Sequence, residues 1–121
     1  IIQTDFTALP SVLFKKSYLE SIFLNLITNS IKYAMPGRNP LIDFHSWVEG
    51  EKQFLSVTDN GSGFDMEEVK DKIFGKHQQF HGHADSKGIG LYLVHNHITS
   101  MGGTIQVNSE PGKGTSFVIC F

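Results

Sequence analysis

Three polar residues with the potential for binding chemistry, Asn25, Asn29 and Lys32, follow one another at spacings of four and three residues. These spacings place the three side chains on one face of a helix. Asparagine is a poor helix former, so two asparagines one turn apart require a reason other than helix formation. An amide oxygen suits a hard cation such as Mg²⁺, and a nearby ammonium group suits phosphate. The alternative interpretation is an ordinary solvated polar face.

A glycine-rich loop lies at residues 59–63, directly after a segment of β-branched and apolar residues. The carboxylate of Asp59 could accept a hydrogen bond from an exocyclic amine, and Gly61 and Gly63 would let a flat ring approach the backbone. A plain Asp-Asn-Gly turn is the alternative.

Two further glycine-rich segments accompany this loop. In residues 86–91, Ser-Lys-Gly-Ile-Gly-Leu, glycines open a second helical pattern, where exposed N–H groups and the helix dipole attract anions. The segment matches neither the dinucleotide-binding fingerprint nor the phosphate-binding loop. Residues 112–117, Gly-Lys-Gly-Thr-Ser-Phe, would alone be a glycine hairpin before the last strand. Because the four motifs occur together in this order, a shared binding site is favoured over separate turns.

The elements that must position these motifs are indicated by hydrophobic periodicity. Ser17 with Glu20 forms a capping box and predicts the start of a helix, which Met35-Pro36-Gly37 ends near Ala34. Its predicted apolar stripe is Leu19, Ile22, Phe23, Leu26 and Ile27, extending to Ser30. Residues 1–6 and 12–14 are interpreted as short strands or extended entries. Strands are predicted at residues 41–48, 54–58, 104–107 and 115–121, and further helices at residues 66–70 and 88–100. Adjacent antiparallel pairs predict an α+β protein, a two-layer α/β sandwich with a mixed, mostly antiparallel sheet and helices on one face.

Composition restricts the class of protein. At 121 residues, with 40% hydrophobic and 18% charged residues, the chain fits one soluble domain. A net charge of −2 with scattered Lys and Arg argues against a nucleic-acid surface. No apolar run approaches the roughly 18 residues of a membrane span. The single Cys120 favours a reducing compartment and is expected to be buried in the last strand, and the start at Ile1 without Met suggests a piece of a larger protein.

The sequence resembles the catalytic and ATP-binding domain of sensor histidine kinases, a branch of the group shared with gyrase, heat-shock-chaperone and mismatch-repair ATPases. Residues 25–33 match the asparagine box of the family, residues 59–64 its first glycine box, residues 88–91 its second glycine box and residues 112–117 its closing strand. Ile73-Phe74 stands where the phenylalanine box begins. The agreement extends from about Phe6 to Phe121, nearly the whole chain.

This resemblance implies a Bergerat-type fold, one mixed sheet backed by three helices, with ATP held under a mobile lid at residues 74–87. It implies that Asn29 coordinates Mg²⁺ with Asn25 beside it, that Lys32 approaches phosphate, and that these three are the catalytic residues. Asp59 would receive the adenine amino group, and Thr115 would support Asp59 through water. Tyr33 would lie near the adenine or ribose. The residues implied to contact the nucleotide are Asn29, Lys32, Tyr33, Asp59, Gly61, Gly63, Ile73, Lys87, Gly88, Ile89, Gly90, Leu91 and Thr115.

One position separates a kinase from the related ATPases. Those ATPases carry a glutamate four residues before the magnesium asparagine, where it activates water, and this chain has Asn25 there. The resemblance therefore implies transfer of the γ-phosphoryl group in two-component signal transduction. Two departures, Ser86 in place of a glycine and no proline after Phe74, leave open a nucleotide-sensing or docking module without kinase activity. An ATPase of the gyrase or chaperone kind is a third hypothesis.

None of the six histidines is followed by Asp or Glu, as the phosphoacceptor of the family usually is, so that histidine is expected outside this chain. The cluster His77, His81 and His83 could bind a metal, but its spacing fits no zinc pattern, and solvated lid residues are the preferred interpretation. His95 and His97 are expected at surface or interface positions and His45 in a structural one. The implied partners are ATP, the dimerisation and phosphoacceptor domain of the same kinase and, indirectly, a response regulator, with no nucleic acid and no membrane contact. The domain is expected to be monomeric and cytoplasmic, and anchoring of the full-length protein at the inner membrane is left open.

Overall fold

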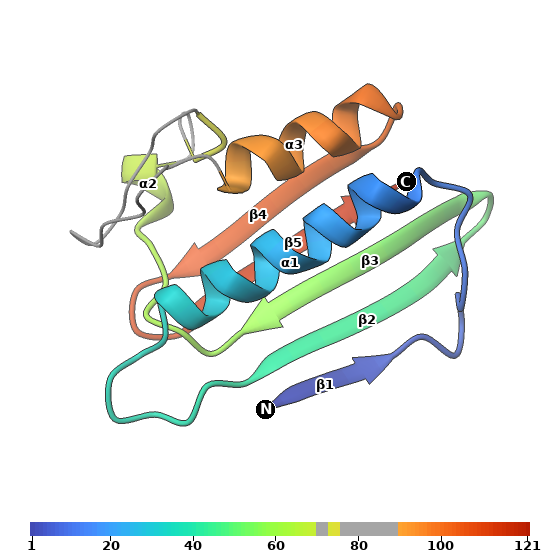
Figure 1. Cartoon of the computed structure of the whole chain (residues 1–121). Coiled ribbons are helices and arrows are strands. Elements are labelled where there is room, and N and C mark those ends of the chain that lie inside the picture. The colour runs from blue at the N-terminus through green and yellow to red at the C-terminus, as the bar shows by residue number, and fades with distance from the viewer. Residues whose placement is uncertain (70–72, 76–89) are drawn as a thin grey trace.

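Alternating apolar and polar residues make the strands of one five-stranded sheet, and two helices, α1 and α3, lie across one of its faces (Figure 1). The computed structural model describes residues 1–69, 73–75 and 90–121. The strands are β1 (Ile2–Asp5), β2 (Ile42–Glu49), β3 (Lys52–Asp59), β4 (Thr104–Glu110) and β5 (Gly114–Cys120). The helices are α1 (Lys16–Lys32), α2 (Met66–Val69) and α3 (Gly90–Ser100).

The strand order is β1-β2-β3-β5-β4. Only the β1–β2 pair is parallel, and the β2–β3, β3–β5 and β4–β5 pairs are antiparallel. The predicted α+β class with a mixed, mostly antiparallel sheet is therefore confirmed. No helix in the described part of the chain has both the length and the apolar character needed to cross a membrane.

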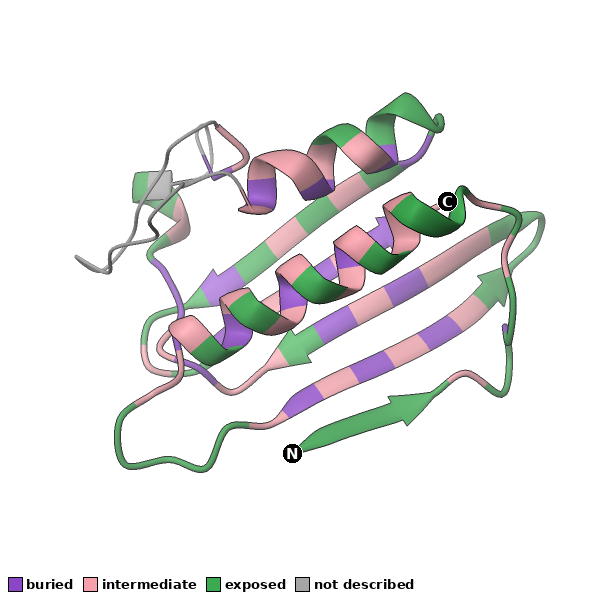
Figure 2. Cartoon of the chain, viewed as in Figure 1, coloured by how far each residue is buried: buried purple, intermediate pink, exposed green. Residues whose placement is uncertain are grey.

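The core lies between the sheet and the two long helices. Along β2, burial alternates, so Ile42 and Phe44 face the helices while their neighbours are only half-buried (Figure 2). Ile22 and Leu26 of α1 are fully buried against this face. The same cluster also takes in Leu55, Val57, Val94, Ile98, Phe117 and Ile119. A strand buries one face through its period of two and a helix buries one stripe, which explains this two-layer arrangement.

The predicted capping box of α1 is wrong. The N-cap is Lys15, no side chain caps the helix, and Ser17 already lies within its first turn. The carbonyl oxygen of Lys15 accepts hydrogen bonds from the N–H groups of Tyr18 and Leu19, at 3.1 and 3.0 Å, so the helix begins before the serine. The helix ends at Lys32 with Tyr33 as its C-cap, slightly before the predicted end at Ala34.

Of the two possibilities for residues 12–14, a short strand or an extended entry, the strand is wrong, because this segment has no partner strand. The neighbour of β2 on that side is β1, and residues 12–14 form no strand. Leu13 is fully exposed (100%), whereas Phe14 packs edge-on against Phe121 with ring centroids 5.3 Å apart. Apolar composition alone therefore did not make a strand there.

Cys120 is half-buried rather than buried, contrary to expectation. In β5 Gly114 is buried, and from Thr115 onward the buried positions Thr115, Phe117 and Ile119 alternate with half-buried ones. The period of two places Cys120 on the opposite face of the sheet, away from α1 and α3. Its free thiol is consistent with the expected absence of an internal disulfide.

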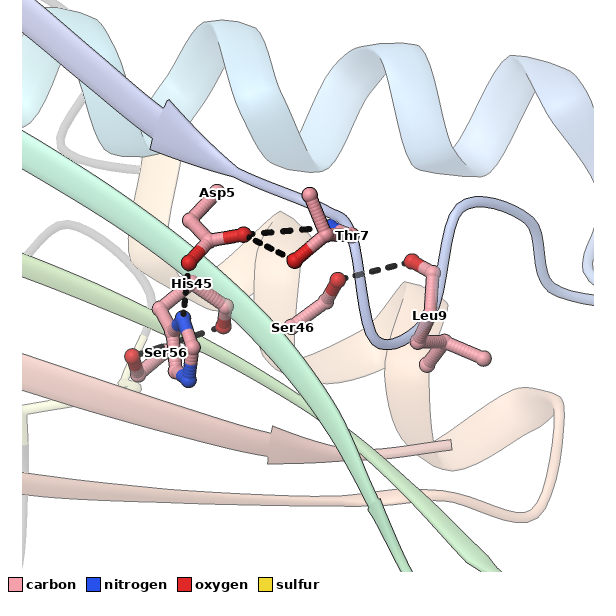
Figure 3. A network of polar contacts seen from close by, with 6 residues as sticks. All are labelled: Asp5, Thr7, Leu9, His45, Ser46 and Ser56. Carbon is pink, nitrogen blue, oxygen red and sulfur yellow. Dashed lines mark hydrogen bonds and ion pairs between the residues drawn. The ribbon is translucent and has the colours of Figure 1, made fainter.

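A small polar network holds the chain after β1 against β2 (Figure 3). One carboxylate oxygen of Asp5 accepts bonds from the N–H and the hydroxyl of Thr7, at 3.1 and 2.7 Å. These bonds, the side-chain one first, lower the pKa of Asp5. The other oxygen lies 3.7 Å from Nδ1 of His45, and the hydroxyl of Ser46 donates to the carbonyl of Leu9 at 2.7 Å. The structural role expected for His45 stays a prediction.

Candidate functional site

The carboxylate of Asp59, at the end of β3, is the centre of the best-defined polar cluster. Its Oδ1 accepts hydrogen bonds from the N–H groups of Gly61 at 2.9 Å and Thr115 at 3.2 Å. Its Oδ2 accepts a bond from the hydroxyl of Ser30 in α1 at 2.9 Å. The three donors come from the loop after β3, from β5 and from α1, so the tertiary fold determines the orientation of this carboxylate.

An ionised carboxylate has about four lone-pair positions and accepts hydrogen bonds without donating any. Two are used at Oδ1 and one at Oδ2, which leaves Oδ2 with capacity for a further N–H donor. Asp59 as a whole residue is half-buried. The cluster can therefore present one oriented acceptor to the amine of a bound ligand.

The loop after Asp59 is clamped to the end of α1. The carbonyl oxygen of Tyr33 accepts bonds from both the N–H and the hydroxyl of Ser62, at 2.9 and 3.0 Å. A Cβ added to Gly61 would stand 2.6 Å from that same oxygen. Gly63 has a φ of +69°, and a Cβ there would collide with the carbonyl oxygen of Glu110. Both glycines are required because the backbone approaches too closely for a side chain.

The ring of Tyr33 lies in the core. Tyr33 is buried and packs edge-on against Phe64, with ring centroids 5.6 Å apart. The ammonium of Lys32, the last residue of α1, lies 5.8 Å from the centroid of the same ring. Contact of Tyr33 with a bound base or ribose stays a prediction.

The β4–β5 hairpin supports the cluster through Ser109, which sequence reasoning missed. The hydroxyl of Ser109 lies 2.8 Å from that of Thr115, donates to the carbonyl of Gly114 and accepts from the N–H of Phe64. Thr115 reaches Asp59 directly through its backbone N–H, while its hydroxyl is bonded to Ser109. The predicted water-mediated support of Asp59 stays untested. A serine at a buried strand position was the available signal, because a buried hydroxyl requires a partner.

Asn25 connects α1 to the first turn of α3. Its side-chain N–H₂ donates to the carbonyl and the hydroxyl of Ser21, at 2.8 and 3.1 Å. Its Oδ1 faces Gly90, where an added Cβ would stand 3.1 Å from that oxygen. Asn29 lies one turn further along α1 and is half-buried. The structure thus brings the predicted polar face of α1 beside the predicted glycine-led start of α3.

Several predicted site residues lie in the core or outside the described residues, and their contact with a nucleotide stays a prediction. Ile73 and Leu91 are buried in the hydrophobic core. Phe74 stacks on His95 with ring centroids 5.1 Å apart. Lys87, Gly88 and Ile89, and with them His77, His81, His83 and all of the predicted lid beyond residue 75, lie outside the described residues.

His97 lies between α1 and α3, whereas a position at the surface or at an interface was expected for it. Its ring stacks on Tyr18 with centroids 4.3 Å apart, and its Nε2 lies 3.2 Å from the hydroxyl of Ser21. Partial burial, followed by the charge of Lys15, lowers the pKa of His97. Folding therefore shifts the imidazole toward its neutral form.

The sequence is similar to a known protein family and to known sensor kinases. The model of the histidine kinase-, DNA gyrase B- and HSP90-like ATPases matches residues 15–121. Sensor histidine kinase ZraS of Escherichia coli K12 is 36% identical over 121 residues, which cover 98% of this chain and 25% of ZraS. Sensor protein RprX of Bacteroides fragilis is 34% identical over 114 residues, covering 91% of this chain and 22% of RprX. The chain thus spans about a quarter of the length of these curated relatives.

Solved structures agree with the sequence comparison. The nucleotide-free catalytic domain of histidine kinase ThkA superimposes with a TM-score of 0.77 and 26% identity, over 99% of this chain and 75% of that domain. Full-length ShkA in complex with AMPPNP superimposes with a TM-score of 0.78 and 26% identity, over 98% of this chain and 25% of ShkA. The predicted fold is therefore that of known histidine kinase catalytic domains.

Proposed function

Because the chain belongs to the family of histidine kinase-, DNA gyrase B- and HSP90-like ATPases, we propose that it is the catalytic domain of a protein-histidine kinase. In this proposal the domain binds Mg-ATP and transfers the γ-phosphoryl group to a histidine on a separate dimerisation and phosphoacceptor domain. A response regulator then receives the phosphoryl group, which makes the domain part of a two-component system. The cytoplasm supplies ATP, and the proposal places the domain there.

The observation that carries this proposal is the oriented carboxylate of Asp59. Three hydrogen bonds hold it, and one acceptor position remains for an exocyclic amine such as that of adenine. Gly61 and Gly63 keep side chains out of the adjoining loop, so a flat ring can approach its backbone.

The phosphates and their cation are assigned to the polar face of α1. Among the described residues no group of three or more His, Cys, Asp or Glu could hold a metal ion. In this proposal the cation is held by the amide oxygen of Asn29 and by phosphate oxygens, a ligand set that suits Mg²⁺. When bound, Mg²⁺ would neutralise phosphate charge, and Lys32 would add an ammonium at the end of the same face.

Asn25 favours transfer over hydrolysis. An amide cannot act as a general base, and its N–H₂ group is already committed to Ser21. Phosphoryl transfer depends mainly on positioning and charge neutralisation, which the α1–α3 face supplies without a base. The acceptor histidine would come from the partner domain, because no histidine of this chain precedes an acidic residue.

Nucleotide binding is tested by titration calorimetry with a non-hydrolysable ATP analogue and Mg²⁺. The wild-type chain should bind, and Asn29→Ala and Asp59→Ala should each weaken binding by about tenfold or more. Asn96→Ala, on the exposed side of α3, is the matched control and should bind like the wild type. Absence of wild-type binding at millimolar nucleotide would overturn the proposal.

Kinase activity is tested by mixing the chain with its own dimerisation domain and γ-labelled ATP. A labelled histidine supports the kinase. Binding without labelling would instead support a nucleotide-sensing or docking module, for which Ser86 and the missing proline after Phe74 are the motivating departures. Sustained phosphate release by the chain alone would point to the ATPase hypothesis that Asn25 argues against.

A further inference from the structure

We infer that Ser30 is a positioning residue for base recognition, whose hydroxyl holds Asp59 in the orientation that selects an adenine amine over a carbonyl oxygen. The inference rests on the proposed function and adds to it a residue that sets base specificity. Ser30 itself touches no ligand in this scheme and acts through Asp59.

The contact has the properties of an oriented, charge-assisted hydrogen bond. Ser30 is only 4% exposed, and its hydroxyl donates to Oδ2 of Asp59 at 2.9 Å. A serine hydroxyl has a single proton, and a buried hydroxyl without a partner is unfavourable. That proton is therefore committed to Asp59.

The three donors to Asp59 divide between its two oxygens. Oδ1 is held by the backbone N–H groups of Gly61 and Thr115, which no side-chain substitution removes. The only donor to Oδ2 among the described contacts is the side chain of Ser30. The last torsion of an aspartate is broad and turns both oxygens together, so each bond to the carboxylate restrains that torsion. Ser30 adds the restraint on Oδ2, from α1, to the two backbone restraints on Oδ1, and so narrows the range of directions in which the remaining acceptor position of Oδ2 points.

Base selection follows from that orientation. Adenine presents an N–H₂ donor at the position where guanine presents a carbonyl oxygen. A carboxylate only accepts hydrogen bonds, so facing guanine it would leave two acceptors opposed and unpaired. A carboxylate that can rotate away reduces that penalty and also binds adenine less well, because it must be ordered on binding. Loss of the Ser30 hydroxyl should therefore weaken ATP binding and narrow the preference for ATP over GTP.

The test uses Ser30→Ala, which removes the hydroxyl, and Ser30→Thr, which retains it. Alanine is smaller and favours helix, so the first variant should fold. Ser46→Ala is the matched control, because Ser46 is equally buried at 4% and its hydroxyl bonds to the carbonyl of Leu9, away from Asp59. Dissociation constants are measured by calorimetry with Mg²⁺ for non-hydrolysable ATP and GTP analogues and for inorganic tripolyphosphate, which has no base.

Ser30→Ala is expected to bind the ATP analogue about tenfold more weakly than the wild type does. The ratio of its affinities for the ATP and GTP analogues should be smaller, and its affinity for tripolyphosphate should be unchanged. Ser30→Thr should have the wild-type ratio of affinities for the ATP and GTP analogues. Ser46→Ala should lower the thermal stability but leave that ratio unchanged. The inference is overturned if Ser30→Ala binds both nucleotides with wild-type affinity, or if its affinities for the ATP analogue and for tripolyphosphate fall by the same factor. A wild-type chain that binds no nucleotide would overturn the proposed function itself, so the two failures are distinguishable.

Discussion

Oδ1 of Asn25 lies so close to Gly90 that a Cβ on the glycine would stand 3.1 Å from it. The contact joins α1 to the first residue of α3, and the amide of Asn25 is held in turn by Ser21. Ser21 also lies 3.2 Å from His97, so a polar seam runs between the two helices. The seam therefore connects polar residues of the two helices that carry the predicted phosphate contacts.

Gly90→Ala should therefore reduce nucleotide affinity more than stability. Alanine favours helix, but its methyl group would push against an oxygen that cannot move without straining the bonds to Ser21. We expect the ATP analogue to bind about threefold to tenfold more weakly, with the thermal midpoint nearly unchanged. Calorimetry and thermal unfolding measure the two effects, with Asn96→Ala as the control on α3. Unchanged affinity would show that the seam tolerates a methyl group.

Gly63→Ala should destabilise the fold much more than Gly37→Ala. Both glycines have positive φ, +69° and +81°, but a Cβ on Gly63 meets the backbone of Glu110 whereas one on Gly37 meets nothing within 4 Å. Comparing the two variants separates two effects, because Gly37→Ala introduces backbone strain alone and Gly63→Ala introduces both strain and steric overlap. We expect a loss of about 1–2 kcal/mol for Gly37→Ala from strain alone, and about 3 kcal/mol or more for Gly63→Ala. Urea unfolding measures both, and equal losses would contradict the steric argument.

Leu26→Ala and Leu24→Ala compare the two faces of α1. Leu26 is 0% exposed within the core cluster, and Leu24 is 63% exposed on the opposite side of the helix. Truncating Leu26 leaves a cavity and should lower the free energy of unfolding by about 2–5 kcal/mol. Leu24→Ala should change it by less than about 0.5 kcal/mol. Similar values from chemical unfolding would mean that α1 is not packed as described.

The lowered pKa of His97 predicts how the free energy of unfolding depends on pH. Partial burial, and then the charge of Lys15, lowers its pKa from 6.5, so the unfolded chain binds a proton at a higher pH than the folded chain. The free energy of unfolding should therefore decrease as the pH falls below about 6.5 toward the folded-state pKa, and this residue should contribute no slope well above 6.5. His97→Gln removes the titration and should flatten that part of the curve. Thermal midpoints of the wild type and of His97→Gln, measured between about pH 7.5 and about pH 5.5, test this pH dependence. Parallel curves of midpoint against pH for the two proteins would refute the prediction.

Much of the fold was predictable because it depends on local periodicity. The α1 helix with Asn25, Asn29 and Lys32 on one face, the strands of the mixed sheet and the loop that begins at Asp59 all follow from spacings within one element. Errors arose where local pattern was insufficient. Residues 12–14 lacked a partner strand, and Ser17 lay inside the helix that it was expected to cap. Cys120 lay at one of the half-buried positions of β5, on the face of the sheet away from the helices.

The sequence by itself determined which residues could do chemistry and in which elements they lie, because residue type and period are local properties. Only the tertiary structure decided how they are combined. The donors to Asp59 include Ser30, 29 residues before it, and Thr115, 56 residues after it, and Asn25 meets Gly90 on another helix. Such contacts depend on strand order and helix packing, which place distant segments within hydrogen-bonding range, and no spacing within a single helix or strand encodes them.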